Sequence, residues 1–109
     1  MIVNHLSFSV AAAKQSAFDE WFPPLVQRTL SHSGCVGYDH LVDPNDPHHH
    51  FLIEVWASPE ALEAHAKTAE HAEITRDGTA LFGMHDLVLR RWADAGGFTI
   101  TERPRTTRD

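Results

Sequence analysis

The chain has 109 residues, of which 42% are hydrophobic and 22% are charged, and these values are typical of one globular domain. Its formal net charge of -6 with neutral histidines argues against non-specific nucleic-acid binding, which requires a basic surface. There is no apolar run long enough to cross a membrane, no signal-peptide pattern at the start, and one cysteine. We therefore predict a cytoplasmic protein without an internal disulfide.

Residues 2–10 predict a first strand, because apolar and polar residues alternate along them. One face of this strand is apolar except for a single amide, and it carries Ile2, Asn4, Leu6, Phe8 and Val10. Asn4 is either an asparagine bonded to backbone or water near a strand end, or a polar anchor at the rim of a pocket.

Residues 11–33 predict a helix with one apolar stripe, formed by Phe18, Trp21, Phe22, Leu25, Val26, Thr29 and Leu30. Pro23 and Pro24 interrupt it, and we expect a kink or a short break near Phe22 because proline removes a helix hydrogen bond. Gly34 is expected to end the helix. The stripe predicts core packing, and Trp21 or Phe22 would line a cavity if the kink opens one.

A β-hairpin is predicted next, with a strand over residues 35–42, a turn over 43–47, and a further strand that ends at Trp56. We interpret Cys35 as a small buried apolar residue, since no base flanks it in sequence. Three histidines at 48–50 suggest a metal site, but neighbouring strand residues point to opposite faces. We therefore predict a solvated loop there and no metal.

Residues 51–71 predict a strand that leads directly into a second helix. Ser58 is a good N-cap and Pro59 suits the first helical position. Helical spacing places His65 on a face otherwise made of Leu62, Ala69 and Ala72. His65 is either a buried neutral histidine bonded to a carbonyl or carboxylate, or a residue that acts on a ligand.

Asp77-Gly78 predicts a turn at the end of the second helix, and residues 85–93 predict a fourth strand. Arg90 and Arg91 near the end of this strand either bind an acidic group or pair with carboxylates. From residue 95 onward Gly, Thr, Arg and Pro dominate. Residues 95–109 therefore predict a flexible tail or an arm onto a partner subunit, in which Phe98 and Ile100 could add a short strand.

The order strand, helix, strand, strand, helix, strand is the ferredoxin-like βαββαβ pattern of the α+β class. We predict a domain over residues 1–94, with a four-stranded antiparallel sheet and two helices on one face. The other face must also be covered, and its half-apolar composition predicts a homodimer through the sheet. The residues assigned to that face are His5, Ser7, Cys35, Leu41, Ile53, Val55, Leu87 and Leu89.

The chain resembles the antibiotic biosynthesis monooxygenase (ABM) family over roughly residues 2–93. The residues that carry the resemblance are Pro24-Leu25-Val26, Gly34-Cys35, Tyr38, the strand from Phe51 to Trp56, and Glu60-Ala61-Leu62-Glu63-Ala64-His65. The resemblance implies the dimeric α+β barrel fold of that family.

The resemblance also implies an enzyme that oxidises a phenolic, anthrone or quinol-type aromatic with O2 and needs no cofactor, neither flavin, haem nor metal. Asn4 and His65 match places where several members of the family have cavity-facing residues. We assign catalytic roles to His65 as a base and to Asn4 as a hydrogen-bond donor. The small aromatic substrate is expected to contact Leu6, Phe8, Trp21, Phe22, Tyr38, Leu62 and Arg91.

Two alternatives stay open. Haem-binding or haem-degrading relatives share the fold, but this chain has His65 where they tend to carry tryptophan, and Thr75 where they carry a helix histidine. A non-catalytic ligand-binding or stress-associated barrel would fill the same space with side chains. A cavity of roughly several hundred Å3 bordered by both Asn4 and His65 favours the enzyme.

Overall fold

The computed structural model describes residues 1–94 and 98–102 of the chain. The sheet contains β1 (Ile2–Ser9), β2 (Cys35–Asp43), β3 (Asp46–Trp56), β4 (His85–Asp94) and β5 (Phe98–Glu102). The helices are α1 (Gln15–Leu30), which follows a 3-10 turn at Ala12–Lys14, then α2 (Pro59–Ala66) and α3 (Ala69–Ala80). This order confirms the predicted ferredoxin-like α+β arrangement.

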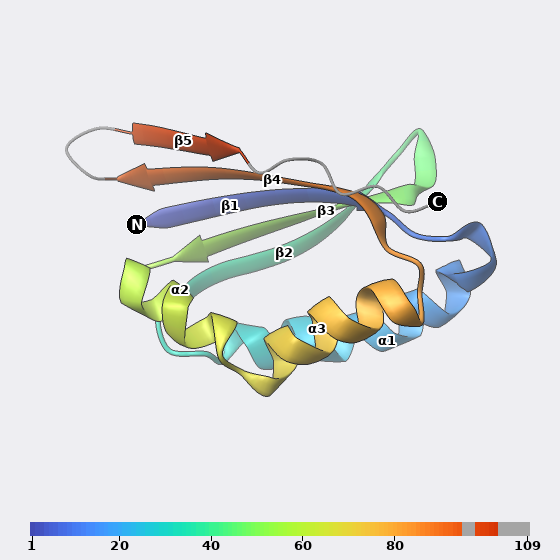
Figure 1. Cartoon of the computed structure of the whole chain (residues 1–109), viewed down its shortest axis with the longest axis horizontal. Helices are drawn as coiled ribbons and strands as arrows, with labels where there is room; N and C mark the ends of the chain where they lie inside the picture. Colours follow the sequence, from blue (N-terminus) through green and yellow to red (C-terminus); the bar gives the residue numbers. More distant parts are fainter. Residues whose placement is uncertain (95–97, 103–109) are drawn as a thin grey trace.

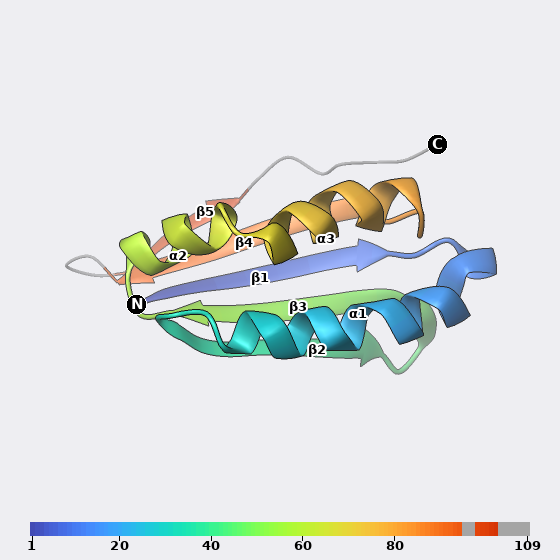
Figure 2. The ribbon, with the colours of Figure 1, turned by 90° about the horizontal axis from the view of Figure 1, so that it is seen from below.

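The strands form one antiparallel sheet in the order β2-β3-β1-β4-β5. All the helices cover one face of it, and α1 lies beside the α2–α3 segment (Figures 1 and 2). The four predicted strands are present, and β5 adds a fifth at the edge next to β4. β5 is the part of the predicted tail that the structure describes, and the rest of that tail lies outside the described residues.

The first helix is continuous, so of the expected kink or short break near Phe22 the break is wrong. Both prolines lie inside α1. Pro23 and Pro24 are exposed, as are Asp19 and Glu20 one turn earlier, so water can reach the carbonyls that lose their helix partners. The missing helix hydrogen bonds lie on the solvated side of α1, so the apolar residues on its opposite side stay buried without a gap.

The end of α1 also differs from the expectation. The helix stops at Leu30, and Gly34 lies in the loop before β2 with a φ of +78°. A side chain at Gly34 would collide with Ala61 on α2, so the glycine allows α2 to approach this loop closely.

The second helix consists of two segments, and the predicted turn at Asp77-Gly78 is wrong. Thr68 separates α2 from α3, and its hydroxyl oxygen accepts a hydrogen bond from the His71 N–H at 3.2 Å. α3 continues through Gly78, which is buried and packs closely against Met84. Tertiary packing therefore keeps a helix where local sequence favours a turn.

The core lies between the sheet and the helices, and it is rich in aromatic residues. Its fully or nearly fully buried members include Phe8, Phe18, Phe22, Leu52 and Trp56. Leu87 and Cys35 pack against this core, and Leu89 is itself buried and lines the helix side of the sheet. Their assignment to the open face of the sheet is therefore wrong. No helix within the described residues is both long and apolar enough to span a membrane.

Candidate active site

A cavity of about 510 Å3 lies between the sheet and the α2–α3 segment. Apolar side chains supply much of its lining, while carboxylate, amide, guanidinium and imidazole groups are also exposed to it. The lining residues are Ile2, Asn4, Leu6, Glu54, Pro59, Leu62, Glu63, His65, Ala66, His71, Thr75, Leu87, Leu89 and Arg91. A concave, partly apolar space with a few convergent polar groups is typical of a small-molecule site.

Three polar residues form a row across the sheet at this cavity. Asn4 on β1 is paired with Glu54 on β3 and with Arg91 on β4. The Arg91 Nε–H donates to Asn4 Oδ1 at 2.7 Å, and the Asn4 side chain also bonds to Glu54. Asn4 therefore bonds to side chains, which favours its interpretation as a polar anchor at the pocket over a strand-end asparagine.

Glu54 is the residue in this row that sequence reasoning missed. The Trp56 indole N–H donates to Glu54 Oε1 at 2.9 Å, and 6% of Glu54 is exposed. Burial raises the pKa of Glu54, while hydrogen bonds from Trp56 and Asn4 and the charge of Arg91 oppose that rise. The signal was present in the sequence, because strand alternation places Glu54 on the same face as Trp56.

His65 enters the cavity from α2, which begins as predicted at Ser58. The Ser58 hydroxyl accepts a hydrogen bond from the Ala61 N–H, and Pro59 occupies the first turn. His65 is 3% exposed and its ring lies 4.4 Å from the Trp56 ring, centroid to centroid. The cap and this contact fix the side of α2 that faces the sheet.

The hydrogen-bond partner of His65 is another histidine. His65 Nδ1 lies 3.2 Å from Nδ1 of His32, which follows α1, and we call these two residues the cavity pair. His32 Nε2 in turn lies 2.7 Å from a carboxylate oxygen of Glu70 on α3. Burial, followed by the neighbouring His71 and His32, lowers the pKa of His65 to about 4, so the ring is neutral at neutral pH.

The structure brings together five of the nine predicted site residues. Asn4, Leu6, Leu62, His65 and Arg91 all line the cavity. The other four lie elsewhere on the helix side of the sheet. Phe8 and Phe22 are buried in the aromatic core, and Trp21 stacks on Phe82 and donates its indole N–H to Glu73. Tyr38 borders a different recess.

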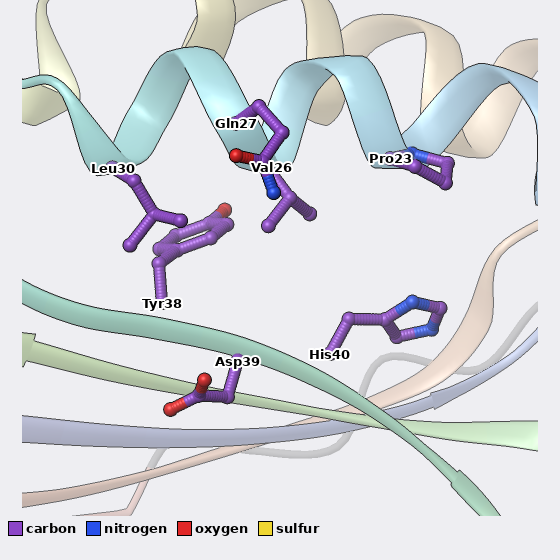
Figure 3. Close-up of a pocket in the computed structure, with 7 residues that line it drawn as sticks. All are labelled: Pro23, Val26, Gln27, Leu30, Tyr38, Asp39 and His40. Carbon is purple, nitrogen blue, oxygen red and sulfur yellow. The ribbon is translucent and has the colours of Figure 1, made fainter.

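That second recess, of about 250 Å3, lies between α1 and β2 and is bordered by Pro23, Val26, Gln27, Leu30, Tyr38, Asp39 and His40 (Figure 3). Tyr38 and His40 project from β2 toward α1, whereas Asp39 points away from the helix (Figure 3). His40 Nε2 lies 2.8 Å from Nδ1 of the fully buried His50, and we call these two residues the core pair.

All three consecutive histidines lie within β3, so the predicted loop is wrong, and their side chains differ in burial. The His50 ring is buried and stacks on Phe8 with a centroid distance of 5.4 Å. His49 Nδ1 lies 3.2 Å from a carboxylate oxygen of Asp43. Among the described residues, no group of three or more His, Cys, Asp or Glu side chains is arranged to hold a metal ion.

Comparison with known proteins agrees with this fold. The family model described as antibiotic biosynthesis monooxygenase matches residues 1–77. No curated protein matches the chain significantly.

Many solved structures are similar, and three illustrate the range. A proposed antibiotic biosynthesis monooxygenase from Deinococcus radiodurans is 20% identical with a TM-score of 0.78, over 93% of this chain and 99% of that one. PA3566 from Pseudomonas aeruginosa is 22% identical with a TM-score of 0.75, over 86% and 93%. Rv0793 from Mycobacterium tuberculosis is 17% identical with a TM-score of 0.75, over 86% and 94%. At these identities the structures support a shared fold.

Proposed function

The chain belongs to the antibiotic biosynthesis monooxygenase family, and we propose that it oxidises a phenolic, anthrone or quinol-type aromatic with O2. The observation that carries this proposal is the cavity of about 510 Å3, which both Asn4 and His65 line. A space of this size suits a small polycyclic molecule. A barrel whose interior is filled by its own side chains would have no such space.

The polar groups of the cavity match the charges that such a reaction develops. In the proposed mechanism, neutral His65 takes a proton from the phenol, enol or activated methylene of the substrate. The resulting anion lies near Arg91, whose positive charge favours it, and the Asn4 amide has a second hydrogen to donate to the oxyanion. The apolar side chains hold the aromatic rings.

The oxidation itself needs an electron-rich anion and O2, and we propose that no flavin, haem or metal takes part. The anion transfers one electron to O2, and the two radicals combine to form a peroxide. For an anthrone, loss of water from that peroxide converts the methylene carbon to a carbonyl. One oxygen atom of O2 then stands in the quinone product and the other in water.

We also propose that the protein is a homodimer that pairs through the open face of the sheet. Strand alternation places His5, Phe51, Ile53 and Val55 on the face opposite the helices, and in the single chain all four are half-buried. A partner sheet would cover this largely apolar face. Sedimentation velocity at micromolar concentration should give a dimer, and a monomer would contradict this proposal.

The proposed reaction is tested with purified protein and a panel of anthrones and naphthoquinols. We expect protein-dependent O2 uptake, and with 18O2 we expect one labelled oxygen in each product molecule. Leu62→Trp should abolish turnover by filling the cavity, whereas Leu81→Trp, at a position 56% exposed, should not. Circular dichroism verifies that both variants fold. O2 uptake at the rate of the buffer across the whole panel would contradict the proposed function.

A further inference from the structure

Three side chains form a continuous chain of hydrogen bonds that ends at the cavity. It runs from Glu70 on α3 to His32 in the loop after α1, and then to His65 on α2. The two links measure 2.7 Å and 3.2 Å between the bonded atoms. His65 is the member that lines the cavity, and His32 and Glu70 lie behind it. The geometry therefore connects a carboxylate to the imidazole that we assign as the base.

The positions of the protons follow from the chemistry of the three groups. An ionised carboxylate only accepts hydrogen bonds, so His32 Nε2 carries the hydrogen that Glu70 accepts. A neutral His32 then has its lone pair on Nδ1. Since two bare nitrogens do not bond to each other, His65 Nδ1 must carry the hydrogen in the 3.2 Å contact. His65 is left with its lone pair on Nε2.

We propose that Glu70 and His32 are positioning residues that fix His65 in the tautomer with hydrogen on Nδ1, so that Nε2 is free to accept a proton. This inference rests on the proposed function, because it assigns a purpose to the tautomer of the base. It also gives the proton a route. When Nε2 takes a proton from the substrate, His65 Nδ1 passes its own proton to His32 Nδ1. The positive charge then lies on His32, beside the Glu70 carboxylate.

The charges around the cavity pair support this distribution. Burial disfavours a charged His65, and the neighbouring His71 on α3 lowers its pKa further, while Glu70 opposes these effects. His32 is bonded directly to the carboxylate, and the pKa of Glu70 is lowered mainly by that bond, with a contribution from Arg28 on α1. The Glu70 carboxylate therefore stabilises the positive charge that the relay places next to it, whereas burial disfavours that charge on His65.

The tautomer can be measured without any substrate. Long-range 1H–15N NMR of uniformly 15N-labelled protein at neutral pH distinguishes a protonated ring nitrogen from a bare one. We expect a bare Nε2 in His65 of the wild type. In Glu70→Gln and His32→Phe the fraction of His65 with hydrogen on Nε2 should rise, because the acceptor chain is broken. Glu73→Gln, on the same helix but bonded to Trp21, is the matched control and should leave His65 unchanged.

A wild-type His65 with hydrogen on Nε2, or a tautomer unchanged in both variants, would overturn the inference. The Glu70 side chain is 24% exposed and Gln has nearly the same shape as Glu, so this variant should fold even if His32→Phe does not. With a substrate in hand, Glu70→Gln should lower kcat about tenfold or more and change KM by less than about twofold. The expected tautomer without turnover on any substrate would overturn the proposed function alone. Turnover that requires His65 but is insensitive to Glu70→Gln would overturn the relay alone.

Discussion

Two histidine pairs, each with one buried member, stand out in the described part of the chain, and they differ in the group that ends each chain of hydrogen bonds. The cavity pair ends on the carboxylate of Glu70, 2.7 Å from His32 Nε2. The core pair ends on the amide oxygen of Gln15, 3.2 Å from His50 Nε2. The Gln15 amide nitrogen donates to Asp19 in turn at 2.7 Å, so the nearest carboxylate is one bond further away.

Burial does not separate the two pairs. It is the main cause that lowers the pKa of both His50 and His65, in each case to about 4. The pairs differ instead in their surroundings, because His50 stacks on Phe8 in the aromatic core whereas His65 lines the large cavity. A histidine pair is therefore suited to proton transfer when it has both a charged anchor and a space for a substrate.

The largest expected effect is a difference in kcat between a variant of the cavity pair and a variant of the core pair. His65→Ala should lower kcat by about 100-fold or more, within the range that a general base contributes. His40→Ala should leave kcat within about twofold. Each variant removes one member of a hydrogen-bonded histidine pair and should cost about 1–3 kcal/mol of stability. Because His65 is buried and His40 is half-buried, urea unfolding of both variants measures the damage to the fold separately. Steady-state kinetics measures both, and equal losses in the two variants would contradict the assignment of the cavity pair.

The second-largest expected effect is a loss of stability at acidic pH, to which both pairs contribute. For His50 and His65 the pKa is lowered from 6.5 to about 4 in the folded chain, so the unfolded chain binds more protons between these values. Their contribution to stability is complete above about pH 6.5 and is lost as the pH falls toward 4. Each histidine contributes at most about 3 kcal/mol to the free energy of unfolding, and solvent screening reduces this contribution.

Urea unfolding at several pH values between 7.5 and 4.5 measures this dependence. Glu54 acts in the opposite direction because its pKa is raised, so the comparison must be made against variants. His50→Phe and His65→Phe should each flatten the loss of stability toward acid by part of its slope. A slope that stays the same in both variants would show that these histidines are not its source.

The fold and the faces of its elements could be predicted because they follow from periodicity. Alternation along β1 placed Asn4 on the helix side, and helical spacing placed His65 on the sheet side of α2. Periodicity gives the face of a residue but not its position along the sheet. Phe8 shares the face of Asn4 but lies further along β1, opposite His50, where the aromatic core fills the space.

The partners of His65 could not be predicted in the same way. His32 lies in a loop without periodicity, and its bond to His65 spans 33 positions of the chain. Glu70 faces His32 only because the chain turns at Thr68 between α2 and α3, whereas the sequence predicted one uninterrupted helix there. The relay depends on these two irregular segments, and for that reason it appears only in the folded structure.

The smallest effect comes from giving the core pair a charged anchor. In Gln15→Glu a carboxylate would stand 3.2 Å from His50 Nε2, where the amide oxygen now lies. An opposite charge at this distance favours the protonated ring, so the pKa of His50 should rise by about one unit or more. An NMR titration of the ring signals measures the shift. Ser16→Glu, exposed on the same helix, adds the same charge without the bond and should have little effect. If both variants raise the pKa of His50 equally, long-range charge rather than the bonded anchor accounts for the difference between the two pairs.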